Sequence, residues 1–279
     1  MTQPILTRRG AIGLIGITAT GALVSQRAFA QETSASATSE STLMPGADVC
    51  VITPEVTEGP YYFDPSLERA DITEGHAGVS TTVRLQVVDA MCKPIEGARV
   101  DLWHCDAEGL YSGYASQTGG VDTTGQTFLR GTRFADANGI AAFNTIYPGW
   151  YAGRTTHMHF KVFLDTTNVL TGQIFFPDAL SQYLYENVEP YKARGSERQT
   201  LNSNDNIAAQ ATRASFAYVK ELADSYLVAM IVGVDPAATS SGNAMGGGGG
   251  PGGPPPDGGT GGPPAENTAT GSMVPGTTG

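Results

Sequence analysis

The chain has 279 residues, including 36 glycines and 17 prolines, and its formal net charge at pH 7 is -11. So acidic a chain is a poor candidate for binding nucleic acid or anionic membranes, because both require lysine and arginine facing phosphate. Its three cysteines are too few for a disulfide-rich scaffold. Glycine and proline are unevenly distributed, so we expect one globular core with non-globular ends.

Residues 1–30 have the pattern of an export signal. Arg8 and Arg9 precede an apolar stretch, residues 11–24, that is too short to span a bilayer comfortably, and a small-residue cleavage site ends at Ala30. The arginine pair is similar to a twin-arginine signal, and an uncleaved membrane anchor is the alternative. We expect an exported protein, periplasmic or extracellular, with no stable membrane insertion once the signal is removed and with disulfides that persist.

Composition divides the rest of the chain. Residues 31–47 are rich in Ser and Thr and are predicted to form a flexible linker. The Gly/Pro-rich segment 237–279 cannot bury enough apolar surface to offset the entropy of ordering, and it is predicted to be a disordered tail. Its glycines do not form a phosphate-binding loop, because no Gly-Lys-Ser/Thr follows them. The globular core is expected to span residues 48–236.

The core is predicted to be all-β. Residues 82–88 and 98–103 each alternate polar and apolar side chains around a Pro/Gly turn, so they are expected to form a hairpin. Residues 128–135 and 140–146 flank an Asn-Gly turn and predict a second hairpin.

Three further strands are predicted over residues 157–164, 171–176 and 226–234, with a short helix over residues 180–187. Many short strands separated by Gly, Pro and Asn turns indicate a sandwich or a barrel.

A His-Met-His sequence is the first candidate for chemistry. His157 and His159 are two positions apart on a predicted strand, so both imidazoles point to one face and can reach one metal ion, while Met158 packs on the other face. A site with two histidines and one carboxylate is poorly supported, because Asp165 lies six strand residues, about 20 Å, beyond His159.

Three other motifs occur in order before this pair. They are Glu-Gly-Pro-Tyr-Tyr at residues 58–62, Trp-His-Cys-Asp-Ala-Glu-Gly-Leu-Tyr at residues 103–111, and Pro-Gly-Trp-Tyr at residues 148–151. With the His pair they closely resemble the intradiol ring-cleavage dioxygenases, the catechol and protocatechuate type, over residues 53–235. The secreted single-domain branch of that family is the nearest likeness. The resemblance implies an immunoglobulin-like β-sandwich with long loops and short helices.

The resemblance also implies a cofactor, one mononuclear Fe(III) per chain, bound by Tyr111, Tyr151, His157 and His159. Fe(III) favours anionic oxygen ligands, and its field can deprotonate phenols whose free pKa is about 10. Tyr114 and Tyr147 are the neighbouring alternatives for the two tyrosinate roles, but the motif register favours Tyr111 and Tyr151.

Other roles are carried over in the same way. Arg154 would contact the reacting substrate and stabilise its negative charge, although it could instead pair with an acid. Tyr151 would also act in catalysis as a base released by the substrate. Gln173 would line the pocket and take part in catalysis. Pro60 and Tyr61 would form part of the pocket wall.

The activity implied by the resemblance is insertion of both atoms of O2 into a catechol-type diol, between the two hydroxyl-bearing carbons, to give a cis,cis-muconate. Tyr151 and His157 are only six positions apart, which indicates an open pocket rim and leaves the preferred catechol undetermined. The alternative is a non-catalytic secreted β-sandwich, on a dioxygenase-like scaffold, that binds polysaccharide or lignin surfaces. The oligomeric state is left open, and a homodimer is compatible with the sequence.

The last predictions concern the three cysteines and His104. Cys92 and Cys105 lie about ten strand residues apart, roughly 30 Å, which is beyond disulfide reach. Cys50 can pair with either, so we expect one disulfide and one buried free thiol. His104 lies beside Trp103, and we expect it to be a core or supporting histidine and not a metal ligand.

Overall fold

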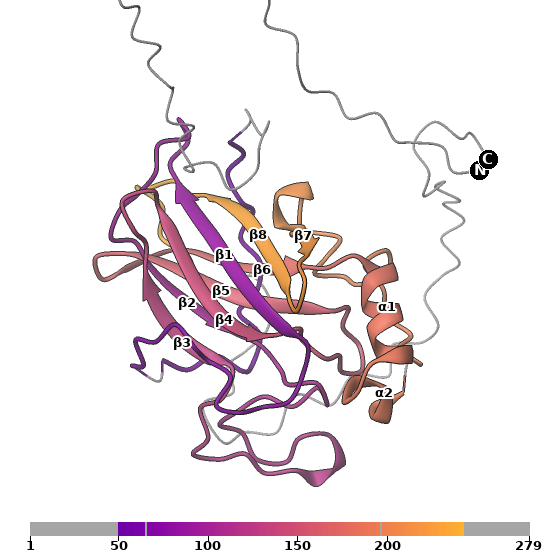
Figure 1. Cartoon of the computed structure of the whole chain (residues 1–279). Helices are drawn as coiled ribbons and strands as arrows, with labels where there is room; N and C mark the ends of the chain where they lie inside the picture. The colour runs from indigo at the N-terminus through magenta and orange to yellow at the C-terminus, as the bar shows by residue number, and fades with distance from the viewer. Residues whose placement is uncertain (1–49, 65, 196, 243–279) are drawn as a thin grey trace, which may run out of the picture. The chain divides into compact units, whose positions relative to one another are not determined.

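The computed structural model describes residues 50–64, 66–195 and 197–242 (Figure 1). The predicted export signal, the linker before residue 50 and the tail after residue 242 lie outside these residues. In the described part of the chain, no helix is long and apolar enough to cross a membrane.

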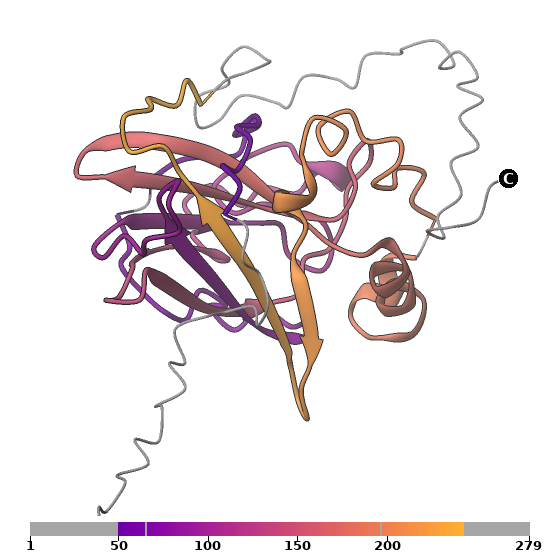
Figure 2. The ribbon, with the colours of Figure 1, turned by 90° about the horizontal axis from the view of Figure 1, so that it is seen from above.

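The described residues form two four-stranded sheets (Figures 1 and 2). The first sheet has the strand order β4–β1–β8–β7, and the second has the order β3–β2–β5–β6. In the first sheet the bounds are β1 (Ser80–Val88), β4 (Ile140–Ile146), β7 (Tyr218–Glu221) and β8 (Tyr226–Gly233). In the second they are β2 (Arg99–Trp103), β3 (Arg130–Phe134), β5 (His157–Leu164) and β6 (Thr167–Phe175). The predicted all-β sandwich is confirmed.

Alternating side chains of both sheets make the core. The inward-facing residues of the central strands β1 and β5 are fully buried in one hydrophobic cluster: Val83, Leu85, Val87, Met158, Phe160 and Val162. Because strand side chains alternate between faces, burial of this set leaves the other residues of β5 on the outer face of the second sheet. That outer face carries the histidine pair.

Two helices follow β6 and pack beside the sheets (Figure 1). They are α1 (Asp178–Asn187) and α2 (Tyr191–Arg194). Leu184 and Tyr185 of α1 belong to the main core, which explains why this segment is ordered as a helix. The helix predicted over residues 180–187 is confirmed, and it begins two residues earlier. Two short 3-10 turns, Thr118–Gly120 and Arg213–Ser215, lie in the loops.

Both predicted hairpins are wrong. β1 pairs antiparallel with β4 and parallel with β8, whereas β2 pairs with β3 and β5 in the other sheet. β3 and β4 are likewise in different sheets.

The turns themselves exist, because the Gly139 amide donates to the Asp136 carbonyl and Gly139 has a φ of 75°. Each connection, however, carries the chain from one sheet to the other. A turn signal and strand alternation specify a reversal, but they do not specify which strands become hydrogen-bonded neighbours. The short edge strand β7 was not predicted at all.

Residues 237–242, which composition placed in the tail, are hydrogen-bonded to the rest of the fold. The Ser240 amide donates to the Asn168 carbonyl (2.8 Å), and the Gly242 amide donates to Glu55 Oε1 (3.1 Å). The Gly242 carbonyl in turn accepts from the Glu58 amide (3.1 Å). The ordered core therefore extends to residue 242 and closes against the segment that begins at Cys50.

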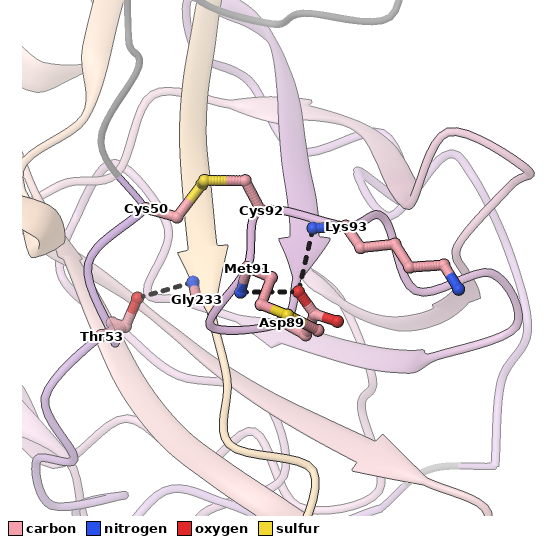
Figure 3. Close-up of a disulfide and its surroundings, with 7 residues drawn as sticks. All are labelled: Cys50, Thr53, Asp89, Met91, Cys92, Lys93 and Gly233. Carbon is pink, nitrogen blue, oxygen red and sulfur yellow. Dashed lines mark hydrogen bonds between the residues drawn. A yellow bond between two sulfur atoms is a disulfide. The ribbon is translucent and has the colours of Figure 1, made fainter.

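A disulfide joins Cys50 to Cys92, and Cys105 is a buried free thiol (Figure 3). The expectation of one disulfide and one buried thiol is confirmed, and the partner of Cys50 is now defined. The bridge holds the first described residues beside the end of β8, where the Thr53 amide donates to the Gly233 carbonyl (2.9 Å).

Loss of this disulfide is expected to lower the free energy of unfolding by about 2–4 kcal/mol, because the bridge spans a sequence separation of 42 and restricts the unfolded chain. Urea denaturation of a Cys50→Ser/Cys92→Ser variant would measure the change. A thiol reductant should destabilise the wild type by the same amount and leave the double variant unaffected. Equal midpoints for wild type and variant would contradict the prediction.

Candidate active site and metal centre

The histidine pair lies on the outer face of the second sheet, as the strand alternation predicts. His159 has Trp103 of β2 and Gln173 of β6 as its cross-strand neighbours. The Trp103 indole stacks on the His159 ring at 4.9 Å between centroids and 11° between planes. Met158 points to the opposite face and is fully buried in the core. The sheet therefore fixes both the direction and the ring plane of His159.

The predicted ligands come together. The Nε2 atoms of His157 and His159 are 3.0 Å apart, and the Tyr151 hydroxyl is 3.1 Å from His157 Nε2. The Tyr111 ring lies 5.7 Å from the Tyr151 ring and 6.1 Å from the His159 ring, between centroids. Its buried hydroxyl has no hydrogen-bond partner within the described residues. The four side chains form one cluster built from three separate segments of the chain.

The two imidazoles are neutral and available as ligands. His157 Nδ1 lies 2.6 Å from the Thr155 carbonyl, which must accept from it, so the proton resides on Nδ1 and the Nε2 lone pair faces the site. Burial and the neighbouring Arg154 charge lower the pKa of His157 to about 3. Burial and His157 lower the pKa of His159 well below its usual value.

The two phenols require a cation to ionise. Burial raises the pKa of Tyr151 to about 12, although the Arg154 charge opposes the shift. Burial and the nearby Tyr151 raise the pKa of Tyr111 well above 10. Two such phenols beside two neutral imidazoles form a donor set that suits a hard, highly charged ion such as Fe(III), which stabilises tyrosinate. Within the described residues no three His, Cys, Asp or Glu side chains gather to form a different metal site.

Arg154 pairs with an acid, which is the alternative to a substrate-contacting role, and it also lies beside the histidine pair. Its Nη1 is 3.3 Å from His157 Nε2, and its Nη2 donates to Gln173 Oε1 (2.6 Å). Its Nε donates to Asp205 Oδ2 (2.9 Å). Gln173 is fully buried and donates onward to the Thr57 carbonyl (2.9 Å). Gln173 thus connects Arg154 to Thr57, the residue immediately before the motif at residues 58–62.

That motif runs across the outer face of the second sheet. The Tyr61 ring stacks on Tyr111 at 4.3 Å between centroids and 10° between planes, and it meets Tyr151 edge-on at 6.2 Å. Gly59 has a φ of 68°, a conformation that favours glycine, and a Cβ added there would lie 3.4 Å from His159 Cε1, an ordinary contact distance. Pro60 lies between Gly59 and Tyr61 in the sequence and is partly exposed. The segment predicted to form the wall therefore borders the predicted ligands.

The alternative tyrosines have other partners. The Tyr114 hydroxyl donates to the Tyr62 carbonyl (3.1 Å), and the Tyr147 hydroxyl is hydrogen-bonded to Ser181 Oγ (2.7 Å) within the main core. His104 is fully buried, with Nε2 bonded to Thr145 Oγ1 (2.7 Å). This geometry favours Tyr111 and Tyr151 as ligands and leaves His104 as a core residue.

Three residues that support the site were not predicted. Asp205 is one, described above. Arg130 is 1% exposed and donates to the Tyr61 carbonyl (2.6 Å) and to Ser112 Oγ (2.8 Å). The Gln117 side chain accepts from the Tyr111 amide (2.7 Å) and donates to the Tyr111 carbonyl (2.7 Å). These residues act through loop contacts, and no periodicity or short motif marks them.

Gln117→Ala is expected to lower the free energy of unfolding by about 1–3 kcal/mol, because the buried Tyr111 amide would lose its acceptor. Chemical denaturation would measure the loss, and Gln210→Ala, at an exposed glutamine, is the control. If Gln117→Ala were no less stable than Gln210→Ala, the amide of Gln117 would not hold the Tyr111 loop.

Comparisons with known proteins agree with this geometry. A model of the family described as Dioxygenase matches residues 57–218, more than half of the chain. The catechol 1,2-dioxygenase of Acinetobacter baylyi is 26% identical over 209 residues, which cover 66% of this chain and 64% of that protein. The chain thus spans somewhat less than two thirds of this relative's length.

Solved structures define the class of protein further. An intradiol ring-cleavage dioxygenase from Tetranychus urticae superposes with a TM-score of 0.63 at 32% identity and covers 69% of this chain and 98% of that one. The dioxygenase domain of a dioxygenase–carbohydrate-binding protein fusion from Streptomyces sp. SirexAA-E gives a TM-score of 0.50 at 28% identity, covering 67% and 100%. The fold is that of a dioxygenase β-sandwich. The chain belongs to the intradiol ring-cleavage dioxygenase family.

Proposed function

We propose that this protein is a non-haem Fe(III) enzyme that cleaves a catechol-type diol with O2, between the two hydroxyl-bearing carbons. The observation that carries the proposal is the convergence of the His157 and His159 Nε2 atoms with the Tyr151 hydroxyl, beside the Tyr111 phenol. Several relatives bear the name catechol 1,2-dioxygenase, and one from Corynebacterium glutamicum bears the name hydroxyquinol 1,2-dioxygenase.

Tyr111, Tyr151, His157 and His159 would hold the iron. When bound, the ion would draw electron density from phenolate oxygens and activate a coordinated catecholate toward O2. Arg154 presents Nη1 toward the same space and would stabilise negative charge that develops on the substrate. Once ionised, the Tyr151 oxygen would accept a proton from an incoming diol, because burial raises the pKa of this phenol to about 12. Tyr61 and Trp103 would exclude water with their rings.

We also propose that the protein is exported through residues 1–30 and acts in the periplasm or outside the cell. The Cys50–Cys92 disulfide supports this proposal, because disulfides persist in oxidising compartments and are rare in the cytosol.

The test is a visible absorption spectrum of the iron-quantified protein, recorded before and after anaerobic addition of catechol. We expect one iron per chain, a tyrosinate-to-Fe(III) charge-transfer band and a shift of that band with catechol. Turnover of catechol, protocatechuate and hydroxyquinol would then rank the substrates. A protein that stays colourless after Fe(III) reconstitution and turns over none of the three would refute the proposal and favour a non-catalytic binding module.

A further inference from the structure

We infer that Asp205 is a positioning residue of this site, whose carboxylate fixes both the Arg154 guanidinium and the backbone of Thr155, the residue whose carbonyl holds His157. The inference rests on the proposed function. Asp205 lies in the loop between α2 and the 3-10 turn Arg213–Ser215, 51 residues after Arg154 in the sequence. Its side chain is 1% exposed.

Every partner of the Asp205 carboxylate is a donor. Oδ2 accepts from Arg154 Nε (2.9 Å) and from the Thr155 amide (2.8 Å). Oδ1 accepts from the Ile207 amide (2.8 Å) and the Ala208 amide (2.9 Å) within its own loop. One oxygen thus shapes the loop, and the other joins that loop to the residues just before β5. Only a group with two acceptor oxygens satisfies all four donors.

The first connection sets the direction of Arg154. The guanidinium is planar and its donors have a fixed fork geometry, so a bond at Nε determines where both Nη atoms point. With Nε on Asp205, Nη2 reaches Gln173 Oε1 (2.6 Å) and Nη1 lies 3.3 Å from His157 Nε2. If His157 Nε2 binds the metal ion, it no longer accepts from Arg154. Nη1 is then the one Arg154 nitrogen that points toward the site without an acceptor among the described residues, because Nε is bonded to Asp205 and Nη2 to Gln173.

The second connection supports His157 through the backbone. The Thr155 amide is bound to Asp205, while the Thr155 carbonyl accepts from His157 Nδ1 (2.6 Å). This bond fixes the tautomer that leaves Nε2 free to ligate. Outer partners of metal-bound histidines commonly change metal affinity or activity by about 10–100-fold when they are removed. Asp205 therefore supports a predicted ligand and the substrate-facing cation with the same oxygen.

Asp205→Asn is the informative variant, and Asp178→Asn is its matched control. An asparagine has one acceptor oxygen and would turn its NH2 toward donors, so one set of partners must be lost. Asp178 anchors the same loop: its Oδ1 accepts from the buried Arg198 (3.1 Å) and its Oδ2 accepts from the Asn202 amide (3.0 Å). It makes no hydrogen bond or ion pair to Arg154 or Thr155 in the described structure. The same chemical change at Asp178 therefore perturbs the loop near Asn202, whose side chain accepts from Thr155 Oγ1 (3.0 Å), but it leaves the Asp205 bonds to Arg154 Nε and to the Thr155 amide in place.

Three measurements on the iron-loaded protein test the inference: kcat/KM for catechol, the rate of iron removal by a chelator, and the thermal midpoint. In Asp205→Asn, kcat/KM should fall about 10–100-fold and iron removal should accelerate about tenfold. In Asp178→Asn both should stay within about threefold of wild type, whatever the shift of the midpoint. In an Arg154→Lys background, adding Asp205→Asn should lower kcat/KM by a smaller factor than it does in wild type, because part of its effect acts through Arg154, whereas iron removal should still accelerate through the His157 connection.

The inference is overturned if Asp205→Asn stays within threefold of wild type in both kcat/KM and iron removal. It is overturned equally if Asp178→Asn produces the same losses, or if the effects of Asp205→Asn and Arg154→Lys multiply independently. Failure of the proposed function gives a different result, since wild type itself would then bind no iron and turn over no catechol.

Discussion

Replacing His157 with alanine is expected to abolish stoichiometric iron binding and to lower kcat/KM for catechol by more than about 100-fold. This loss exceeds the roughly 10–100-fold that follows removal of a residue that only hydrogen-bonds to a metal ligand. His157 Nε2 lies 3.0 Å from His159 Nε2 and 3.1 Å from the Tyr151 hydroxyl, so its removal takes away the centre of the donor cluster. Iron analysis and the visible spectrum of the purified variant would measure the effect. His104→Asn, at a fully buried histidine outside the cluster, should lose stability but keep its iron.

A pair of tyrosine variants separates ligation from packing in the same experiment. Tyr111→Phe keeps the ring that stacks on Tyr61 and removes a buried hydroxyl that has no hydrogen-bond partner, so the protein should be at least as stable as wild type. Its iron binding and colour should nevertheless be lost. Tyr147→Phe breaks the bond to Ser181 and should lose about 1 kcal/mol of stability while retaining iron. A coloured Tyr111→Phe protein with full iron content would contradict the assignment of this ligand.

The part of the site that could be predicted was local. Strand alternation alone placed His157 and His159 on one face with Met158 on the other, because the period of a strand is two and depends on no distant residue. The motif register distinguished Tyr111 and Tyr151 from their neighbours. Their meeting with the histidines, however, depends on how three segments cross the outer face of one sheet, and this followed from the family resemblance and not from spacing.

The errors have a physical cause. β1 and β2 each have the alternation and the turn that a hairpin requires, yet each pairs with strands from elsewhere in the chain. The apolar side chains are buried equally well whether the chain crosses to the other sheet or folds back within the same sheet. The local sequence pattern therefore could not decide which strands pair. Asp205 was missed for a related reason. Its neighbours Asn204 and Asn206 are typical of a polar turn, and only the folded loop brings the carboxylate to Arg154.

Arg154→Gln is expected to lower kcat/KM for catechol by about 100- to 1,000-fold while iron content stays near one per chain. The guanidinium does not belong to the predicted ligand set, but its Nη1 faces His157 Nε2 from within a partly buried hydrogen-bond network. A charge held in this way stabilises negative charge on a bound substrate more strongly than a solvated one would, because little water screens it. Arg154→Lys keeps the charge but loses the planar fork, so it should recover only part of the activity.

Arg198→Gln is the matched control, since Arg198 is likewise an arginine paired with a carboxylate, Asp178, in the neighbouring part of the fold, and it is more deeply buried than Arg154. It should cost stability and leave kcat/KM within about threefold of wild type. If Arg154→Gln and Arg198→Gln lost activity to the same extent, the charge of Arg154 would have a structural role only. If Arg154→Gln lost its iron, the residue would be acting through His157, and the step that it controls would be assembly of the site.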